Sequence, residues 1–380
     1  MLKRVADFLK GLGVFLIVFI VLLEAASYVY IRFVNQNIPL PTYSFVNAGS
    51  KFWKFIDPHF GVWHSPNSEY LHNKSCFVVQ YSANSHGMRD VERTLKSAEP
   101  RTVILGDSFI EGWGNELDER LSGLLETRLD SEVLNFGTSG GFGTIQQWQQ
   151  YTHMVSRFDH DVVMLGVLPY NDFKDNDLET GMRNGEYRPF LKGQYPNYEQ
   201  EYAADELPDP NRPMPLLKSF DFTLREWSSF YRVMRYLGSY RIQGMQLVPR
   251  WQEEYDRGGA GSRYYNHTPE EWDVMRYSLE RLAEAAKGKQ LIVFTIPALP
   301  DFAEYDGQEP PLSRSIREVA QEKGFAYVDL LEEFHQKGLT PYEVFFVCDN
   351  HWSPEGNAAA AAALAPHVEA ALQRAAEGRQ

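Results

Sequence analysis

The 380-residue chain has little cysteine and no excess of basic residues. Its two cysteines, Cys76 and Cys348, are too few for a disulfide scaffold or for a cysteine-ligated zinc site. Lys and Arg number 37 against 51 Asp and Glu, a formal net charge of −14, which argues against a nucleic-acid-binding protein. Internal repeats, a glycine-rich phosphate loop and histidine pairs at metal-binding spacing are also lacking. We therefore expect no cofactor and no metal.

The composition that is present is globular, with 43% apolar, 14% aromatic and 23% charged residues. These proportions exclude wholesale disorder. The length allows one large domain or two smaller ones. Aromatic residues often line concave surfaces, but they are more commonly core, so their abundance alone predicts no binding site.

An apolar segment lies near the N-terminus. Residues 11–31 carry one charge, that of Glu24. As a helix rising about 1.5 Å per residue, this segment would span roughly the 30 Å of a bilayer core. Basic residues precede it, so the positive-inside rule predicts a cytoplasmic N-terminus and a periplasmic or extracellular location for the chain after Arg32.

A cleaved signal peptide is the competing interpretation, with residues 11–23 as its apolar region and Ala25-Ala26-Ser27 offering small residues for cleavage. A buried core helix is disfavoured by the basic flank. We favour a single-pass anchor in the cytoplasmic membrane, and both exported alternatives place the rest of the chain outside. An acid such as Glu24 inside a span can mark a partner contact, or it can simply snorkel or be protonated.

Short apolar segments alternate with helix-like stretches over much of the remaining sequence. The apolar segments are 102–106, 132–136, 161–167, 290–296 and 325–329. The helix-like stretches include 119–130, 144–157 and 313–323, and an alanine-rich helix is expected over 354–375. Continuous apolar strands between helices predict a parallel sheet covered on both faces. We therefore expect an α/β fold, a flavodoxin-like three-layer sandwich with a five-stranded parallel sheet.

Changes in pattern divide the chain into three parts. The expected parts are a cytoplasmic tip and membrane anchor over 1–33, a linker and short β layer over 34–99, and the main domain over 100–375. Within the main domain, residues 177–270 interrupt the alternation and predict a long insertion with helical pieces. One helix is expected to start at Thr268, where Thr-Pro-Glu-Glu has the character of a capping box.

Four polar segments follow the predicted strands, where sites form in open parallel sheets. The first, Gly106-Asp107-Ser108-Phe109, places a serine where a helix begins, although such residues often merely cap helices. The second, 135–143, is glycine-rich, so that backbone N–H groups can approach a substrate oxygen. The third, 169–172, contains Asn171, whose side-chain amide can reach the same oxygen, although an Asn-Asp pair is otherwise ordinary in turns.

The fourth segment, 348–356, contains His351 just before a predicted helix. A histidine can take a proton from a serine and return it to a leaving group. Asp349 can orient the imidazole and stabilise its charge. A single histidine is more often structural, and the weight of the prediction comes from four segments at four strand ends in one order.

That order resembles the SGNH/GDSL hydrolase superfamily over roughly residues 100–365, apart from the insertion. The resemblance implies that Ser108 is the nucleophile and His351 the base. It further implies an oxyanion hole formed by the Ser108 N–H, the Gly140 N–H and the side chain of Asn171.

Two positions depart from the superfamily pattern. Pro169 stands where the third block usually has glycine, and proline fixes φ and removes an N–H. Cys348 stands three residues before His351, where the superfamily has its acid, which leaves Asp349 as the candidate because residues two apart share a face of extended backbone. Upstream, residues 84–90 are similar to a stretch found in membrane-anchored members.

These observations predict an anchored serine esterase or O-acyltransferase that forms an acyl-enzyme outside the membrane. Acylated carbohydrate or a small ester is the expected substrate, by analogy, with a membrane-bound acyl-transfer or polysaccharide-export protein as a candidate partner. The alternative is a catalytically degenerate SGNH domain that serves as a binding or scaffold subunit of an envelope polysaccharide complex. A Cys76–Cys348 disulfide would tie the β layer to the catalytic loop, but sequence gives no Cα distance and leaves the pairing open.

Overall fold

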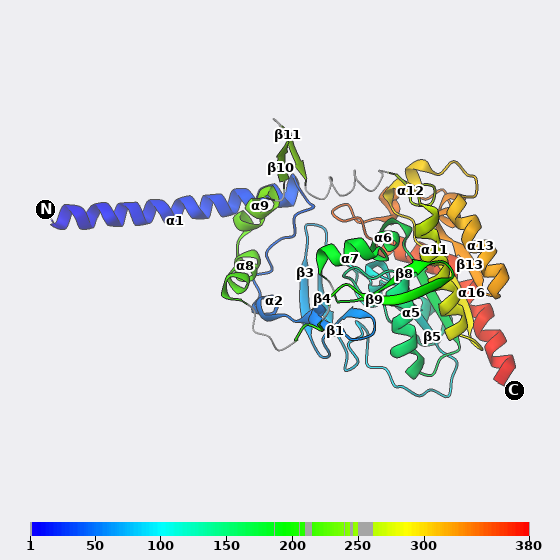
Figure 1. Cartoon of the computed structure of the whole chain (residues 1–380). Helices are drawn as coiled ribbons and strands as arrows, with labels where there is room; N and C mark the ends of the chain where they lie inside the picture. The colour runs from blue at the N-terminus through cyan, green and yellow to red at the C-terminus, as the bar shows by residue number, and fades with distance from the viewer. Residues whose placement is uncertain are drawn as a thin grey trace.

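The computed structural model describes residues 2–379 except 186, 205, 210–214, 239, 244–245 and 250–260. A long helix, α1 (Leu2–Phe33), projects from a rounded domain that contains the other elements (Figure 1). The C-terminus lies at the end of the domain that is farthest from α1.

One sheet of five parallel strands forms the centre of the domain, in the order β13-β12-β7-β5-β6. The strands are β5 (Thr102–Leu105), β6 (Val133–Asn135), β7 (Val162–Val167), β12 (Gln290–Thr295) and β13 (Ala326–Asp329). Every residue of β5, β6 and β7 is buried, which explains their nearly continuous apolar sequence. The predicted α/β class and five-stranded parallel sheet are confirmed.

Helices cover both faces of the sheet and complete the three layers. Along β5, Ile104 packs into one core and Val103 and Leu105 into the other. The first core is covered by α3 (Ser108–Glu111), α4 (Leu121–Leu129), α12 (Leu299–Glu304), α14 (Leu330–Gln336), α15 (Pro341–Val344) and α16 (Pro354–Arg379). The second is covered by α5 (Thr144–His153), η2 (Val155–Arg157), α11 (Pro269–Ala285) and α13 (Pro311–Lys323).

The segment between α1 and the sheet is more structured than the predicted linker. It forms α2 (Phe45–Gly49), η1 (Phe52–Lys54) and two antiparallel pairs, β1 (Phe55–Asp57) with β2 (Gly61–Trp63) and β3 (Glu69–Asn73) with β4 (Val78–Ser82). The reason is burial, since Phe52, Phe60 and Trp63 are almost fully enclosed by the domain. The predicted short β layer therefore corresponds to two small two-stranded sheets.

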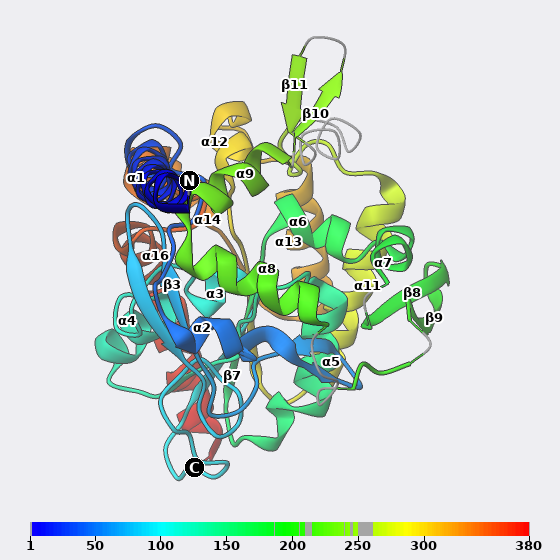
Figure 2. The same ribbon diagram turned by 90° about the vertical axis from the view of Figure 1, so that its left-hand side faces the viewer.

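The region predicted to be an insertion contains both helices and hairpins. After α6 (Pro169–Asp175) come α7 (Leu178–Asn184), β8 (Pro189–Gln194), β9 (Asn197–Tyr202), α8 (Leu216–Trp227), α9 (Ser229–Gly238), β10 (Tyr240–Gln243) and β11 (Gln246–Pro249). The next helix, α11, starts with the expected capping box, in which Thr268 and Glu271 bond each other's backbone N–H at 3.2 and 2.8 Å. Figure 2 shows α8 lying across the face from which α1 emerges.

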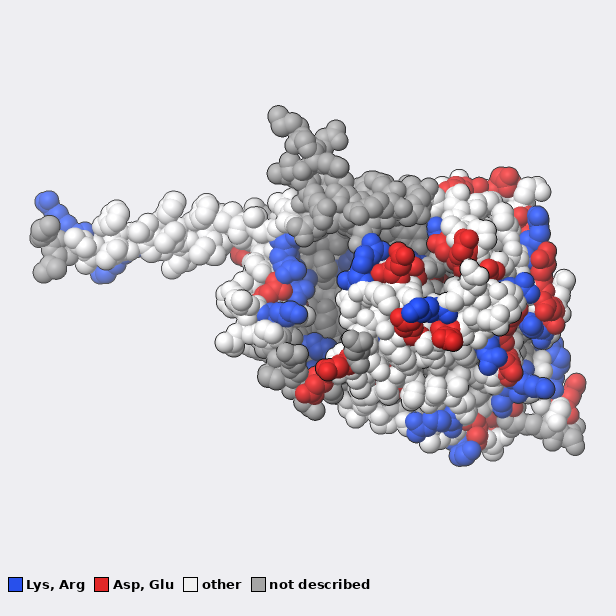
Figure 3. All heavy atoms as spheres, in the orientation of Figure 1, with Lys and Arg blue, Asp and Glu red and all other residues white. Residues whose placement is uncertain are grey.

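Among the described residues, α1 is the one helix that is long and apolar enough to cross a membrane, with a mean hydropathy of 2.5 over its most apolar window. An anchor and a signal sequence share these properties. Between its basic N-terminal end and Arg32 in its last turn, α1 carries one charged residue, Glu24, and the part that projects from the domain is otherwise uncharged (Figure 3). The residues before Glu24 are largely exposed, whereas Ser27 and Ile31 are buried against the domain.

Candidate active site

The nucleophile candidate lies at the junction between β5 and α3. The chain turns sharply at Gly106, where a Cβ would clash with the side chain of Ile110. Asp107 then caps α3 by accepting the backbone N–H of Phe109 at 2.9 Å. Ser108 is the first residue of this helix, half-buried at the carboxyl end of the sheet. The position matches the one that the sequence predicts.

The predicted serine, histidine and aspartate form a continuous hydrogen-bonded chain. Ser108 Oγ lies 2.8 Å from His351 Nε2, and His351 Nδ1 lies 2.6 Å from Asp349 Oδ1. With the Nδ1 proton directed at Asp349, Nε2 is left to accept the serine proton. This is the spatial arrangement of a Ser-His-Asp triad.

Asp349 is held by two further side chains that the sequence did not reveal. Lys74 Nζ lies 2.6 Å from Asp349 Oδ2 and also donates to the Cys348 carbonyl at 3.1 Å. Trp113 Nε1 donates to Asp349 Oδ2 at 3.3 Å. Burial alone would raise the pKa of Asp349, but the His351 hydrogen bond and the Lys74 charge outweigh it and hold that pKa well below its ordinary value. The carboxylate is therefore ionised at neutral pH.

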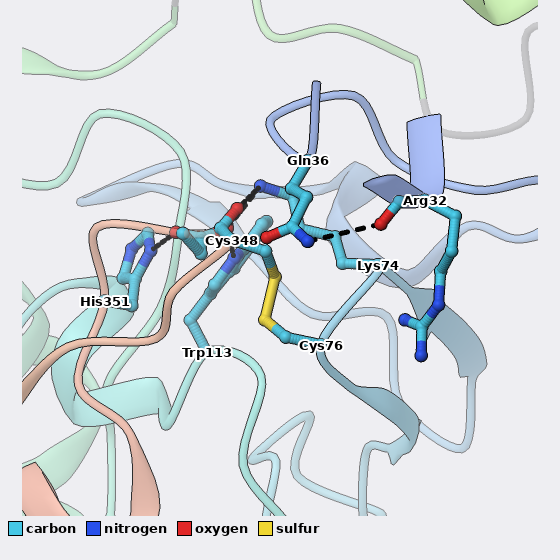
Figure 4. The surroundings of a disulfide bond; sticks show 8 residues. Arg32, Gln36, Lys74, Cys76, Trp113, Cys348 and His351 are labelled. Carbon is cyan, nitrogen blue, oxygen red and sulfur yellow. Dashed lines mark hydrogen bonds and ion pairs between the residues drawn. A yellow bond between two sulfur atoms is a disulfide. The ribbon is translucent and has the colours of Figure 1, made fainter. Parts of the chain in front are cut away.

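A disulfide joins Cys76 to Cys348, with the Cα atoms 5.8 Å apart. It settles the pairing that the sequence left open. Cys76 lies in the connection between β3 and β4, so the bridge ties this hairpin to the loop that carries Asp349 and His351 (Figure 4). The loop between α15 and α16 is thus fixed covalently next to the proposed base.

The imidazole of His351 lies between two aromatic rings. Trp113 stacks on it at 5.2 Å between centroids with planes 26° apart, and Phe109 lies at 4.8 Å on a tilted plane. The His351 carbonyl accepts the N–H of Phe346 at 2.9 Å, which fixes the backbone of the loop. Ring contacts and backbone bonding therefore restrict the orientation of the imidazole.

Asn171, the third-block candidate, is on the first turn of α6. Pro169 is the first residue of that helix, where its missing N–H would have had no helical partner, so the departure from glycine costs no hydrogen bond. The Asn-Asp pair, interpreted above as a turn, is helical. Asn171 Nδ2 donates to Asp107 Oδ2 at 3.2 Å, which orients the amide and leaves its second N–H for another acceptor.

Gly140, the second-block candidate, is exposed in the loop between β6 and α5 with φ of +114°, a conformation that favours glycine. The preceding Ser139 donates to Glu111 of α3. The loop is therefore bonded to the helix that carries Ser108. The three predicted oxyanion-hole residues come from α3, this loop and α6. Each of these segments begins where a strand of the central sheet ends, so all three lie at the carboxyl edge of the sheet.

Two buried acids support this edge of the sheet. Burial raises the pKa of Asp107, partly offset by the bonds that it accepts from Phe109 and Asn171. Burial also raises the pKa of Asp172, and the nearby Asp107 raises it further. Asp172 Oδ2 accepts the N–H of Leu168 at 2.9 Å, so Asp172 holds the first turn of α6.

Glu111 is a third residue that the sequence analysis missed. Its carboxylate is fully buried and accepts Trp53 Nε1 at 3.1 Å, with His64 Nε2 at 3.4 Å. The spacing of Glu111 to Ser108 on one helical turn was a usable signal. Lys74 gave no signal in the sequence, because its partner Cys348 lies 274 positions away. The described residues include no group of three or more His, Cys, Asp or Glu side chains that could hold a metal ion.

A comparison with known protein families finds a match for the C-terminal part of the chain. A family model described as the SGNH hydrolase-like domain of acetyltransferase AlgX matches residues 269–380. No curated protein matches the sequence.

Similar solved structures are remote. A member of the lipolytic G-D-S-L family from Veillonella parvula DSM 2008 is 10% identical, with a TM-score of 0.37, covering 70% of this chain and 96% of its own. The lipase/acylhydrolase from Enterococcus faecalis is 13% identical, with a TM-score of 0.35, covering 71% of this chain and 96% of its own.

The matched segment runs from α11 through the last two strands and includes Asp349 and His351. Upstream of it, Ser108, Gly140 and Asn171 stand at the ends of the strands that the four-block order requires. Residues 269–380 are thus similar to an SGNH hydrolase-like domain, and the residues of all four blocks lie at the strand ends that the resemblance in sequence requires.

Proposed function

We propose that the protein is a membrane-anchored, extracytoplasmic serine esterase or O-acyltransferase that acts on ester-linked acyl groups, with acylated carbohydrate as its substrate class. The observation that supports this most directly is the hydrogen-bonded chain from Ser108 through His351 to Asp349 at the carboxyl edge of the sheet. The SGNH family match supports acyl chemistry in general terms.

In the proposed mechanism, Ser108 Oγ attacks the ester carbonyl while His351 Nε2 takes the serine proton. Asp349 stabilises the resulting imidazolium. The negative oxygen of the tetrahedral intermediate accepts hydrogen bonds from the Ser108 and Gly140 N–H groups and from the Asn171 amide. His351 then protonates the leaving alcohol, which leaves an acyl-enzyme on Ser108.

The second half of the reaction decides between the two activities. Water activated by His351 gives hydrolysis, whereas a sugar hydroxyl in the same position gives transfer. Both share one acyl-enzyme, so the side chains described above serve either outcome. Tyr170, half-exposed beside Asn171, offers an aromatic surface for a sugar ring at this edge.

Anchorage is the second part of the proposal. The apolar α1 supports it, and the disulfide fits an oxidising compartment outside the cytoplasmic membrane. We expect the mature chain to retain residues 1–23. N-terminal sequencing that began at Tyr28 would refute the anchor while leaving export intact.

The test is to incubate the full-length protein with p-nitrophenyl acetate, with and without an acetylated oligosaccharide, and to follow acyl release and acyl transfer separately. Transfer that exceeds release identifies an acyltransferase, and release alone identifies an esterase. Neither activity, in a folded protein with its disulfide intact, would favour the degenerate scaffold domain. The two sequence departures that motivated that alternative now have structural accounts, at Pro169 and at Asp349.

A further inference from the structure

α8 is amphipathic in the reverse sense of an ordinary surface helix. Its polar residue Glu226 is buried and accepts hydrogen bonds from Thr42 at 2.5 Å and Asn47 at 3.2 Å. Its apolar residues Leu216 and Leu217 are 88% and 85% exposed. Helices of water-soluble domains bury their apolar side instead, so the outer side of α8 is suited to an apolar environment.

α9 continues the same surface. Val233 and Tyr236 pack on the buried Ile31 of α1, whereas Met234 and Leu237 are exposed. We define the apolar pad as Phe45, Leu216, Leu217, Phe220, Met234 and Leu237, each exposed on α2, α8 or α9. Phe45 joins the pad to α8 because its ring packs on that of Trp227 at 5.0 Å. Figure 2 shows α9 beside α1, with α8 and α2 on the same face of the domain at one side of it.

Glu24 joins α1 to α9. Its carboxylate accepts the backbone N–H groups of Ser229 at 2.8 Å and Phe230 at 3.3 Å, together with the Ser228 hydroxyl. These are the first groups of α9, where the helix dipole favours a negative charge. The acid in the predicted span therefore has a partner within its own chain.

The length of the uncharged part of α1 then fixes the depth of α9. Residues 11–23 rise about 20 Å as a helix, which is about 10 Å less than a bilayer core. To complete the span, residues 24–31 must also enter the bilayer. Those residues pack against α9, so α9 and its neighbour α8 enter the outer leaflet with them.

We propose that the apolar pad is embedded in the outer leaflet of the bilayer that α1 spans. This inference rests on the membrane anchorage proposed above. The depth of about 10 Å is that of interfacial amphipathic helices. α8 and α9 carry four basic residues, Lys218, Arg225, Arg232 and Arg235, against the acids Asp221 and Glu226. Arg225 and Arg235 pair with Asp221 and the largely buried Arg232 pairs with Glu226, which leaves a net positive charge that suits anionic lipid headgroups. Figure 3 shows basic side chains gathered at the edge of the domain next to α1.

The embedded pad would turn the candidate active site toward the membrane. α16 starts at Pro354, three residues after His351, and runs to the C-terminus at the end of the molecule farthest from α1 (Figure 1). The carboxyl edge of the sheet, with Ser108, is therefore on the membrane side. Acyl donors or acceptors held at the bilayer surface become the substrate class that this orientation favours.

Single introduced cysteines in the full-length protein can test the pad, because both native cysteines are in the disulfide. Phe220→Cys and Met234→Cys are labelled with bimane and reconstituted into phosphatidylethanolamine–phosphatidylglycerol vesicles with brominated acyl chains. Val14→Cys, in the uncharged part of α1, is the reference for immersion. Lys96→Cys is the reference for a label in water. The Lys96 side chain is 84% exposed and pairs with Asp159, which precedes β7.

We expect the bromolipids to quench most of the fluorescence at positions 220, 234 and 14 and little at position 96. Labels at 220 and 234 that behave like the label at 96, with position 14 quenched, would overturn the pad while leaving the anchor in place. That result would assign the surface to a protein partner. A label at position 14 that escapes quenching would refute the anchorage itself, and with it the premise of the pad.

A matched variant separates the pad from catalysis. Phe220→Glu changes an exposed residue outside the candidate active site, so the protein should fold and hydrolyse p-nitrophenyl acetate at the wild-type rate. In this variant, we expect bromolipid quenching of a bimane label at position 234 to fall several-fold, because a charge at the interface opposes insertion of the pad. Unchanged quenching in Phe220→Glu would contradict the embedded position of α8.

Discussion

The two sides of the candidate site are built differently. Ser108 is placed by neighbours in sequence: Gly106 allows the turn, Asp107 caps the helix, and β5 and α3 are regular elements. His351 is on an irregular loop, and the contacts that hold it come from Lys74, Cys76 and Trp113.

This difference separates local from long-range positioning. The nucleophile depends on a strand-to-helix turn that forms wherever the sheet forms. The base depends on hydrogen bonds and a disulfide between segments more than 200 positions apart in the sequence. These contacts exist only in the complete fold. Changes to these long-range contacts should therefore affect the base while leaving the nucleophile in place.

Removal of the nucleophile should give the largest effect. Ser108→Ala is expected to lower acyl turnover by roughly four to six orders of magnitude, because a triad serine forms the covalent intermediate. The melting temperature should stay near that of wild type, since the lost group is small and half-buried. Ser156→Ala, on an exposed residue, is the control. Loss of only a few-fold would place the nucleophile elsewhere.

Asp349→Asn should be the next most severe change. The base remains but loses its charge partner and fixed tautomer, so we expect acylation to slow on the order of 10⁴-fold, less than for His351→Ala. Single-turnover acylation rates measure this directly. A wild-type rate in Asp349→Asn would remove the aspartate from the triad and leave a Ser108–His351 dyad.

Loss of the disulfide should affect the histidine side of the site and leave the serine side in place. Reduction, or the double change Cys76→Ala/Cys348→Ala, should lower the free energy of unfolding by about 2–5 kcal/mol. It should also slow acylation, because the loop of His351 loses its covalent attachment. The double variant is its own control, since reductant should not affect it further. Two free thiols in the unfolded, non-reduced wild type would contradict the bridge.

Lys74→Met tests the charge that supports the acid. The pKa of Asp349 is depressed in the folded protein, so its stabilising effect is present above the ordinary aspartate pKa of 3.8 and is lost as the pH falls through the folded value. We expect the variant to be less stable by about 2 kcal/mol at pH 7. The gap to wild type should narrow at low pH, as measured by urea unfolding. A gap independent of pH would assign the effect of Lys74 to packing.

Asp107→Asn addresses the nucleophile side and should have a smaller effect on stability than Lys74→Met. Burial raises the pKa of Asp107, so the unfolded chain ionises more readily and this group lowers stability as the pH rises above 3.8. The variant should therefore become more stable relative to wild type over that range. Denaturant titrations at several pH values give the difference, and the opposite slope would contradict the assigned direction.

Much of the architecture was predictable because it depends on local pattern. Apolar runs ending in glycine or polar residues predicted the strands, and Thr268 with Glu271 predicted the start of α11. The four blocks predicted Ser108, Gly140, Asn171 and His351 in chain order, and the structure brings them to one edge. Their catalytic roles remain predictions until activity is measured.

Residues that act at a distance were not predictable. Lys74 and Trp113 follow no motif. Glu111 lies one helical turn from Ser108, but its partners Trp53 and Ser139 come from other segments and are visible only in the folded protein. The segment after α1 lacked periodicity because its elements are short and are stabilised by burial of aromatic rings rather than by propensity.

The sequence by itself determined the parallel sheet, the order of the site blocks and an apolar N-terminal helix, since periodicity and turn chemistry are local properties of a chain. Only the tertiary structure decided which partners complete the site and which residues of α1 contact the domain. The Cys76–Cys348 bridge, the Lys74–Asp349 pair and the bonds of Glu24 to α9 join segments far apart in sequence. Such contacts form only when packing of the whole domain brings those segments together, and no local pattern encodes them.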